Sequence, residues 1–233
     1  MACISSISAL IGALTLVSAE SAVIGSSGDN PPFTDLDGRG EIIGIDRDIG
    51  DELCRRTGLR CSWVRVEFDQ LIPSLLSEEI DIAISGLASS REREKLVAFT
   101  VDYLPSDGLN NFVGRAGAPP PDAALIGVQS GTIQERHLIE TNRRIRSYPS
   151  QTDVMAAAAA GEVDLVFGPF AARSIGDFFE TEGLEYLFTE AVGTDGPAVA
   201  VCKGNGDLLE RLDTALSAMI ADGTIDRIDA RWD

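Results

Sequence analysis

The stretch DQLIPSLLSEEIDIAISGL, residues 69–87, has a counterpart in TDVMAAAAAGEVDLVFGPF, residues 152–170. Each contains a segment with helical spacing, a short turn, an apolar residue followed by aspartate, and an apolar strand that ends at a small residue. The pairs Ile80-Asp81 and Val163-Asp164 occupy equivalent places. Two such units, 83 residues apart, predict two similar α/β lobes, and the alanines at 156–160 then belong to a helix packed closely on a sheet.

The first unit continues a regular alternation of strands and helices. This order predicts mainly parallel sheets covered by helices. The predicted elements are strands at 22–26, 42–45, 61–66 and 80–85, helices at 47–57 and 68–77, and a helical segment at 207–233. Between the two units, AGAPPPDAA at 116–124 reads as a linker. Two facing lobes enclose a cleft, which is a preferred place for a ligand.

Composition excludes some classes of function. The chain has 233 residues, 44% of them hydrophobic, and a formal net charge of −18. It is long enough to build a proper core. Such an acidic chain cannot neutralise a run of phosphates, so we expect no nucleic-acid partner. The charge also disfavours anionic membrane surfaces. It does not indicate a cationic ligand, because acidity of this kind also serves solubility.

The N-terminus has the pattern of a secretion signal. Residues 4–17, ISSISALIGALTLV, form an apolar run shorter than the roughly 20 residues that span a bilayer. Small residues at 17–19 suit a cleavage site, although no lysine or arginine precedes the run. We therefore expect a signal peptide at 1–19 and a periplasmic protein; a buried N-terminal helix is the alternative.

The cysteines agree with export. Cys54 and Cys61 end a predicted helix and begin a strand, and the short loop between them makes a disulfide geometrically easy. Two reduced thiols are the alternative. Cys3 would leave with the signal peptide, and Cys202 reads as a small buried hydrophobe. With one histidine and no CxxC pair, we expect no metal site and no cofactor.

Six segments in this order resemble the amino-acid-binding family of bacterial extracellular solute-binding proteins, the receptors of ABC importers. They are NPPF (30–33), GIDRDIGDELCRRTG (44–58), FDQLIPSLLSEEIDIAISGL (68–87), SSREREKLVAFT (89–100), GVQSGTIQE (127–135) and AAGEVDLVFG (159–168). The resemblance implies two α/β lobes joined by two hinge strands that close on a ligand. Lobe 1 would comprise residues 20–109 and 194–233, and lobe 2 residues 110–193. It also implies an inner-membrane ABC permease as partner, a monomer, and a disulfide between Cys54 and Cys61.

The resemblance further implies a ligand site. Phe68 would lie against the ligand, Arg93 would bind its α-carboxylate, and a second-lobe turn would donate backbone N–H groups to the same carboxylate. An arginine offers a fork of donors that matches a carboxylate, and helix N-termini attract anions. Thr132 and Glu135 also have capping-box spacing. The remaining implied positions are Ser85, Gly86, Leu87 and Ala88 in the first lobe, and Ser130, Gly131, Thr132 and Gln134 in the turn.

One position departs from the family pattern. The second-lobe carboxylate that holds the ligand's α-ammonium group falls at Pro169. The first-lobe acid that some members use for basic side chains falls at Ser27, and a nearby aromatic position is Asn30. Burying an ammonium group without an anion is costly. Either Asp29, Asp195 or Glu135 substitutes, or the ligand is a small carboxylate whose amine is modified or absent, with Phe68, Phe167 and Phe170 facing its apolar or methylated part.

Other interpretations remain open from the sequence. Arg93 alternates with acids as it would on a solvated helix, Phe68 and Phe167 would suit a core, and Thr132 could be a simple helix cap. A cyclohexadienyl-dehydratase-like enzyme shares the implied fold and would need a positioned general acid. His137 is the one histidine, and we expect it to be exposed rather than catalytic. A sensor partner in the membrane is a further alternative to a permease.

Overall fold

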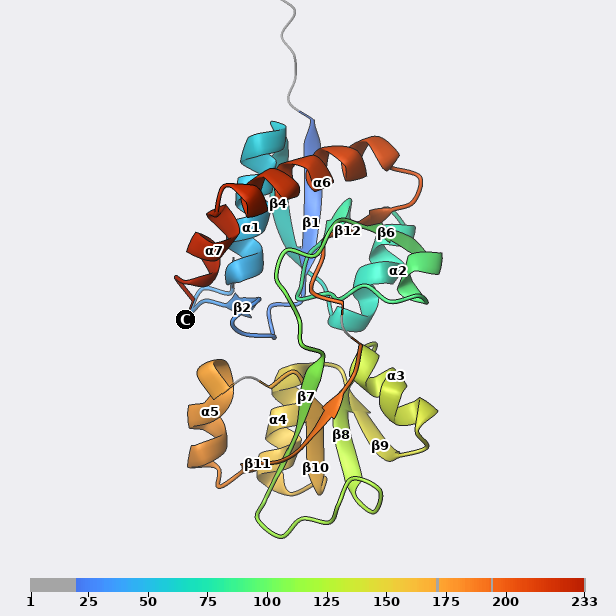
Figure 1. The fold of residues 1–233 in the computed structure, drawn as a ribbon, viewed down its shortest axis with the longest axis vertical. Helices are drawn as coiled ribbons and strands as arrows, with labels where there is room; N and C mark the ends of the chain where they lie inside the picture. The colour runs from blue at the N-terminus through green and yellow to red at the C-terminus, as the bar shows by residue number, and fades with distance from the viewer. Residues whose placement is uncertain (1–19, 171, 194, 233) are drawn as a thin grey trace, which may run out of the picture.

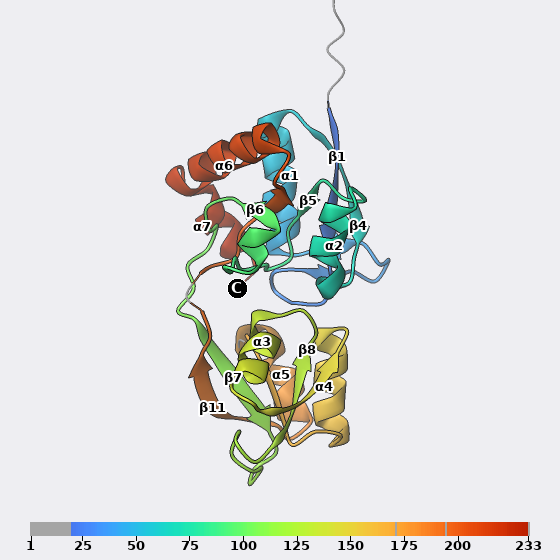
Figure 2. The same cartoon turned by 90° about the vertical axis from the view of Figure 1, so that its right-hand side faces the viewer.

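The structure is a computed structural model that describes residues 20–170, 172–193 and 195–232, with only the backbone given for 172–176. The predicted signal peptide, with Cys3, lies outside the described residues. Figures 1 and 2 show two lobes, one above the other, joined by two crossing segments. Among the described residues, no helix has both the length and the apolar character needed to cross a membrane.

Lobe 1 is built on a five-stranded sheet with helices on both faces. The strand order is β4-β1-β5-β12-β6. α1, α6 and α7 share one hydrophobic core cluster, and α2 belongs to another, with Phe68 and Leu87. The elements are β1 (Ser21–Ser26), β2 (Asp35–Leu36), β3 (Ile42–Ile43), α1 (Ile45–Thr57), β4 (Arg60–Arg65), η1 (Phe68–Gln70), α2 (Leu71–Leu76), β5 (Ile82–Ala83), η2 (Arg93–Lys95), β6 (Val97–Phe99), β12 (Ala200–Cys202), α6 (Gly206–Ala221) and α7 (Thr224–Asp229).

Lobe 2 repeats this plan with strand order β11-β7-β10-β8-β9. α4 and α5 contribute to one core cluster and α3 to another, so helices again cover both faces. Ala157 and Ala158 of α4 are buried, as the predicted close packing requires. The elements are β7 (Leu109–Gly114), β8 (Leu125–Gln129), α3 (Ile133–Glu140), β9 (Arg144–Tyr148), α4 (Gln151–Ala160), β10 (Leu165–Gly168), α5 (Ala172–Thr181) and β11 (Glu185–Ala191).

The sheets are more mixed than predicted. β1 is parallel to β4 and β5, but β12 runs antiparallel to β5 and β6. In lobe 2, β8 is parallel to β9 and β10, whereas β7 runs antiparallel to β10 and β11. The strands that run against the rest of their sheets are β7 and β12, and each of them follows a crossing between the lobes. A strand that follows a crossing enters its lobe from the side of the other lobe and therefore runs against its neighbours. The alternation of helices and strands in the sequence does not reveal this direction.

Two aspartates confirm that the units at 69–87 and 152–170 are equivalent. In lobe 1, Asp81 accepts a hydrogen bond from the amide of Val23 at 2.8 Å, and its own amide donates to the Val23 carbonyl at 2.9 Å. In lobe 2, Asp164 makes the same two bonds with Leu125, at 2.7 and 2.9 Å. Each aspartate thus joins the start of one parallel strand to its neighbour.

The segment predicted as one helix at 68–77 is divided in two. A short 3₁₀ helix, η1, precedes α2, which has Pro73 in its first turn. Proline lacks an amide hydrogen, so an α-helix that began at Phe68 would lose its bond at this point. The division places the buried Phe68 at the start of η1, beside the space between the lobes.

The chain crosses between lobes twice, after β6 and after β11. The first crossing covers residues 100–108, and the described residues of the second are 192–193 and 195–199. The lobe boundaries expected at residues 109 and 194 stay a prediction. In the second crossing, Pro197 accepts a hydrogen bond from the amide of Tyr103 at 2.9 Å and forms a bridge with Ala88. The two crossings are therefore bonded to each other and to the end of lobe 1 that faces lobe 2.

Candidate functional site

A cleft of about 870 Å³ lies between the lobes. Its walls come from segments that follow β1 and β5 in lobe 1, from those that follow β8 and β10 in lobe 2, and from both crossings. Carboxyl ends of strands are where open α/β sheets place ligands. The polar residues that line it are Asn30, Arg93, Ser106, Asp107, Asn110, Asn111, Gln129, Thr132, Gln134, Gln151, Thr189 and Asp195.

Arg93 is a buried cation in this cleft. Its guanidinium donates to the carbonyl of Ala88 at 2.6 Å and to that of Gly131, in the other lobe, at 2.9 Å. It also lies over the ring of Phe68, 5.5 Å from the centroid. Burial, with a smaller contribution from Arg136, lowers the pKa of Arg93 to about 10. No aspartate or glutamate of the described chain forms an ion pair with it. A buried guanidinium held by carbonyls alone favours an anionic ligand.

The turn before α3 faces Arg93 from lobe 2. Thr132 is the N-cap: its hydroxyl oxygen accepts from the amide of Glu135 at 3.1 Å, and the hydroxyl donates to the carbonyl of Gln129 at 2.7 Å. The Glu135 carboxylate accepts from the amide of Gly131 at 2.7 Å and from the Ser147 hydroxyl. The predicted capping box therefore exists in a shifted form: Glu135 accepts from the amide of Gly131, one residue before the N-cap, rather than from that of Thr132. Glu135 is committed to this turn and does not line the cleft.

Gly131 lies where the lobes touch. Its φ is +73°, and a Cβ added there would come within 2.7 Å of the Cβ of Asp69 in lobe 1. Any side chain would therefore hold the lobes apart. An ion pair between Arg136 and Glu92, at 2.9 Å, also joins the lobes. Together with the bond from Arg93 to Gly131, these contacts describe a closed arrangement.

A buried acid holds the end of β5. Asp46 accepts hydrogen bonds from the amide of Gly86 and the hydroxyl of Tyr103, both at 2.6 Å. Burial raises the pKa of Asp46 to about 7, against the effect of these two bonds. Gly86 has φ +56° and lines the cleft, and Tyr103 belongs to the first crossing. Asp46 thus connects the cleft wall with the first crossing. The sequence did not reveal this role, because an aspartate at the start of a helix is also what helix capping would place there.

Most of the predicted ligand positions line the cleft. These are Asn30, Phe68, Gly86, Ala88, Arg93, Thr132, Gln134 and Pro169. The other four lie behind it. Ser85 is buried, with its hydroxyl 2.8 Å from that of Ser27 and accepting from the Ser27 amide at 3.0 Å. Leu87 belongs to the core, and Ser130 and Gly131 belong to the turn without lining the cleft.

The end of β10 carries no charge. Pro169 is exposed, and the ring of Phe170 folds back over Gly168, where an added Cβ would lie 2.9 Å from it. Phe170 is also edge-on to Phe179, with centroids 5.4 Å apart. Phe167 stacks on Phe112 at 4.1 Å and is almost fully buried. Both phenylalanines reach the cleft wall, but most of their surface is packed in the core of lobe 2.

The candidate substitute acids differ in their surroundings. Asp29 is buried: its Oδ2 accepts from the Gln129 side-chain amide at 2.8 Å and from the Gln151 backbone amide at 3.1 Å. Its Oδ1 is buried and has no hydrogen-bond partner among the described residues. Asp195 is exposed and lines the cleft in the second crossing. Asp107, in the first crossing, also lines it, and we did not predict it because PSDG reads only as a loop.

His137 is half-buried, which corrects the expectation of exposure. Its Nε2 lies 2.6 Å from a carboxylate oxygen of Glu190 in β11, so packing between α3 and β11 shields part of the ring from solvent. It does not line the cleft. No cluster of side chains suited to a metal ion occurs in the described part of the chain.

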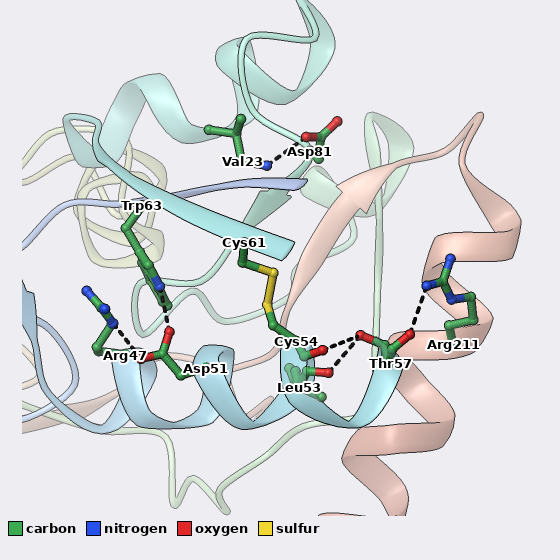
Figure 3. The surroundings of a disulfide bond; sticks show 10 residues. All are labelled: Val23, Arg47, Asp51, Leu53, Cys54, Thr57, Cys61, Trp63, Asp81 and Arg211. Atoms are coloured by element: carbon green, nitrogen blue, oxygen red, sulfur yellow. Dashed lines mark hydrogen bonds and ion pairs between the residues drawn. A yellow bond between two sulfur atoms is a disulfide. The ribbon is translucent and has the colours of Figure 1, made fainter. Parts of the chain in front are cut away.

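The predicted disulfide joins Cys54 and Cys61, with Cα atoms 6.2 Å apart. It connects α1 to β4 (Figure 3), and neither cysteine lines the cleft. In the same surroundings, Asp51 binds the indole N–H of Trp63 at 2.9 Å, and Arg211 donates to the Thr57 carbonyl at 3.1 Å. Cys202 is only partly buried, rather than buried as expected, because it lies at the end of β12.

Comparisons with known proteins agree with this geometry. Residues 22–233 match the family described as bacterial extracellular solute-binding proteins, family 3. The lysine/arginine/ornithine-binding periplasmic protein of Escherichia coli (strain K12) is 30% identical, over 97% of this chain and 94% of its own. The histidine-binding periplasmic protein of Salmonella typhimurium is 30% identical, over 90% and 86%. A periplasmic His/Glu/Gln/Arg/opine family-binding protein from Silicibacter pomeroyi, solved with lysine, superimposes with a TM-score of 0.83 at 28% identity, covering 91% of this chain and 96% of its own.

Proposed function

The chain belongs to family 3 of the bacterial extracellular solute-binding proteins, and on that basis we propose that it binds a small carboxylate-bearing solute of the amino-acid type. The lobes close around this solute and present it to the permease of an ABC importer. The relatives reported above are named as binding proteins, and we propose that this chain likewise binds without catalysis.

The observation that carries the proposal is the buried guanidinium of Arg93. It lies in the cleft, contacts both lobes through carbonyl groups, and has no anionic partner among the described residues. A carboxylate placed there would gain a charge-assisted hydrogen bond from the arginine and bonds from the first turn of α3. Thr132 offers its backbone N–H, which has no acceptor among the described residues. Phe68 would lie against the ligand.

The same family membership supports a proposal for location and assembly. The relatives are periplasmic proteins, which supports export of this chain with residues 1–19 as a signal peptide. We propose a monomer whose lobes, residues 20–109 with 194–233 and residues 110–193, move about the two crossings. Closure would make the contacts of Arg93 with Gly131 and of Arg136 with Glu92, and the closed form is the one a permease would recognise.

A ligand panel tests the proposal. Residues 20–233 are heated with each of the common L-amino acids and with L-ornithine, each beside its N-methyl and 2-hydroxy-acid counterparts. A ligand at a hundred times its dissociation constant should add about 2.7 kcal/mol to the free energy of unfolding. We expect at least one amino acid or one of its counterparts to raise the melting temperature of the wild-type protein. The same compound should not raise the melting temperature of the Arg93→Ala variant. If none of these compounds stabilises the wild-type protein, the proposed ligand class is wrong.

A further inference from the structure

Gln129 lies beside the strand end that lacks an acid. β8 and β10 are parallel neighbours, with Ile126 opposite Leu165 and Gly127 opposite Val166. The same offset places Gln129 opposite Gly168, one residue before Pro169. Both Gln129 and Pro169 line the cleft. A group lost after β10 can therefore be supplied from the end of the adjacent strand.

The side chain of Gln129 has a defined orientation. Its Nε2 donates to Asp29 Oδ2 at 2.8 Å and is 3.4 Å from the carbonyl of Pro149. A carboxylate and a carbonyl only accept hydrogen bonds, so the NH₂ group must face them. The amide oxygen of Gln129 has no donor among the described residues. It remains available on a residue that lines the cleft.

Asp29 places a negative charge behind this amide. It belongs to lobe 1, whereas both groups that bind its Oδ2, the Gln129 side chain and the Gln151 amide, belong to lobe 2. Asp29 is 6% exposed, forms no ion pair with a described lysine or arginine, and keeps Oδ1 without a partner. A buried carboxylate that lacks a cation favours a positive group nearby.

We propose that Gln129 and Asp29 take the place of the acid that position 169 lacks. The amide oxygen of Gln129 accepts a hydrogen bond from the protonated amine of the ligand. Asp29 is a positioning residue, because it orients the amide and supplies the charge. The site is complete only when the lobes close, since the two residues lie in different lobes. This inference rests on the proposed function and narrows it to solutes that keep a protonated amine.

The test measures selectivity for the amine. Affinities of L-arginine, L-lysine and L-histidine, and of their 2-hydroxy acids, are determined by calorimetry for wild type, Gln129→Met and Asp29→Asn. Wild type should prefer the amino acid. In Gln129→Met its affinity should fall about tenfold, while that of the hydroxy acid changes little. Asp29→Asn should reduce the same ratio severalfold. A purely structural role would weaken both compounds equally and leave the ratio unchanged.

A matched control uses a similar pair elsewhere. The exposed Gln70 donates from Nε2 to Asp69 Oδ1 at 3.1 Å, so Gln70→Met repeats the substitution on a solvated amide and should alter neither affinity. If Gln129→Met does not fold, Gln129→Asn withdraws the amide by one methylene and should lower the ratio too. Ratios that stay at the wild-type value in both variants, or a wild type that prefers hydroxy acids, overturn this inference and leave the proposed function standing. Absence of binding by every compound of the full ligand panel overturns both.

Discussion

The two lobes carry matching strands that begin alike and differ where they reach the cleft. At the start of the paired strands, Asp81 and Asp164 make the same two bonds to the neighbouring strand. Beyond the other end, lobe 1 provides the buried Asp46 and the cation of Arg93, whereas lobe 2 provides Pro169. The framework of the sheet is thus repeated, and the chemistry at its edge is particular to each lobe. A function missing from one strand end can be carried by the next strand.

The largest effect is expected at the charged end of lobe 1. Arg93→Ala removes the one buried cation we assign to the ligand carboxylate and should weaken binding of an amino-acid ligand at least about a thousandfold, near 4 kcal/mol. Isothermal titration calorimetry measures this directly. Arg91→Ala changes an exposed arginine two residues away and should leave affinity unaltered. Equal affinities for wild type and Arg93→Ala would show that lobe 1 does not bind the ligand carboxylate through Arg93.

The acid behind the lobe 1 strand end should make stability depend on pH. The folded state raises the pKa of Asp46 from 3.8 to about 7. Between these values the folded chain retains a proton that the unfolded chain has released, so the free energy of unfolding falls as pH rises. Compared with Asp46→Asn, wild type should lose roughly 3 kcal/mol between pH 5 and 8. Urea unfolding at both values tests this, and parallel pH profiles for the two proteins would contradict it.

The disulfide stabilises lobe 1 and should not affect ligand selectivity. Cys54 and Cys61 are seven positions apart, so their bond closes a short loop. Replacing both with serine should lower the free energy of unfolding by about 2.5 kcal/mol. Denaturant titration measures the change, with Cys202→Ser as the control for losing a thiol that forms no disulfide. A double variant as stable as wild type would mean that the bond constrains the unfolded chain little.

The equivalent aspartates should give the smallest and most similar effects. Asp81→Ala and Asp164→Ala each remove the acceptor of one backbone amide, and each should cost about 1 kcal/mol. Asp177→Ala, at an exposed position of α5, controls for the lost charge. If one substitution lowered the free energy of unfolding strongly and the other did not, the two aspartates would share their hydrogen-bond geometry but not their contribution to stability.

Several features could be read from local patterns because they depend on neighbours in the chain. Residues close in sequence form each of these features: the N-cap at Thr132, strand β10 and the Cys54–Cys61 bond. The features that local patterns did not reveal depend on distant partners. His137 is half-buried because Glu190 lies against it, and the sheets are mixed because of the strands that cross between lobes.

The amino-acid sequence by itself determined the two repeated units and the absence of an acid at position 169, since spacing and residue type carry both of these, and it left the Cys54–Cys61 bond as one of two alternatives. Only the tertiary structure decided that Arg93 is buried with no acidic partner among the residues described, that Asp46 binds the Gly86 amide, and that Asp29 meets Gln129 from the opposite lobe. The physical reason is that burial and hydrogen bonding between residues 40 or 100 positions apart exist only after the lobes form and close.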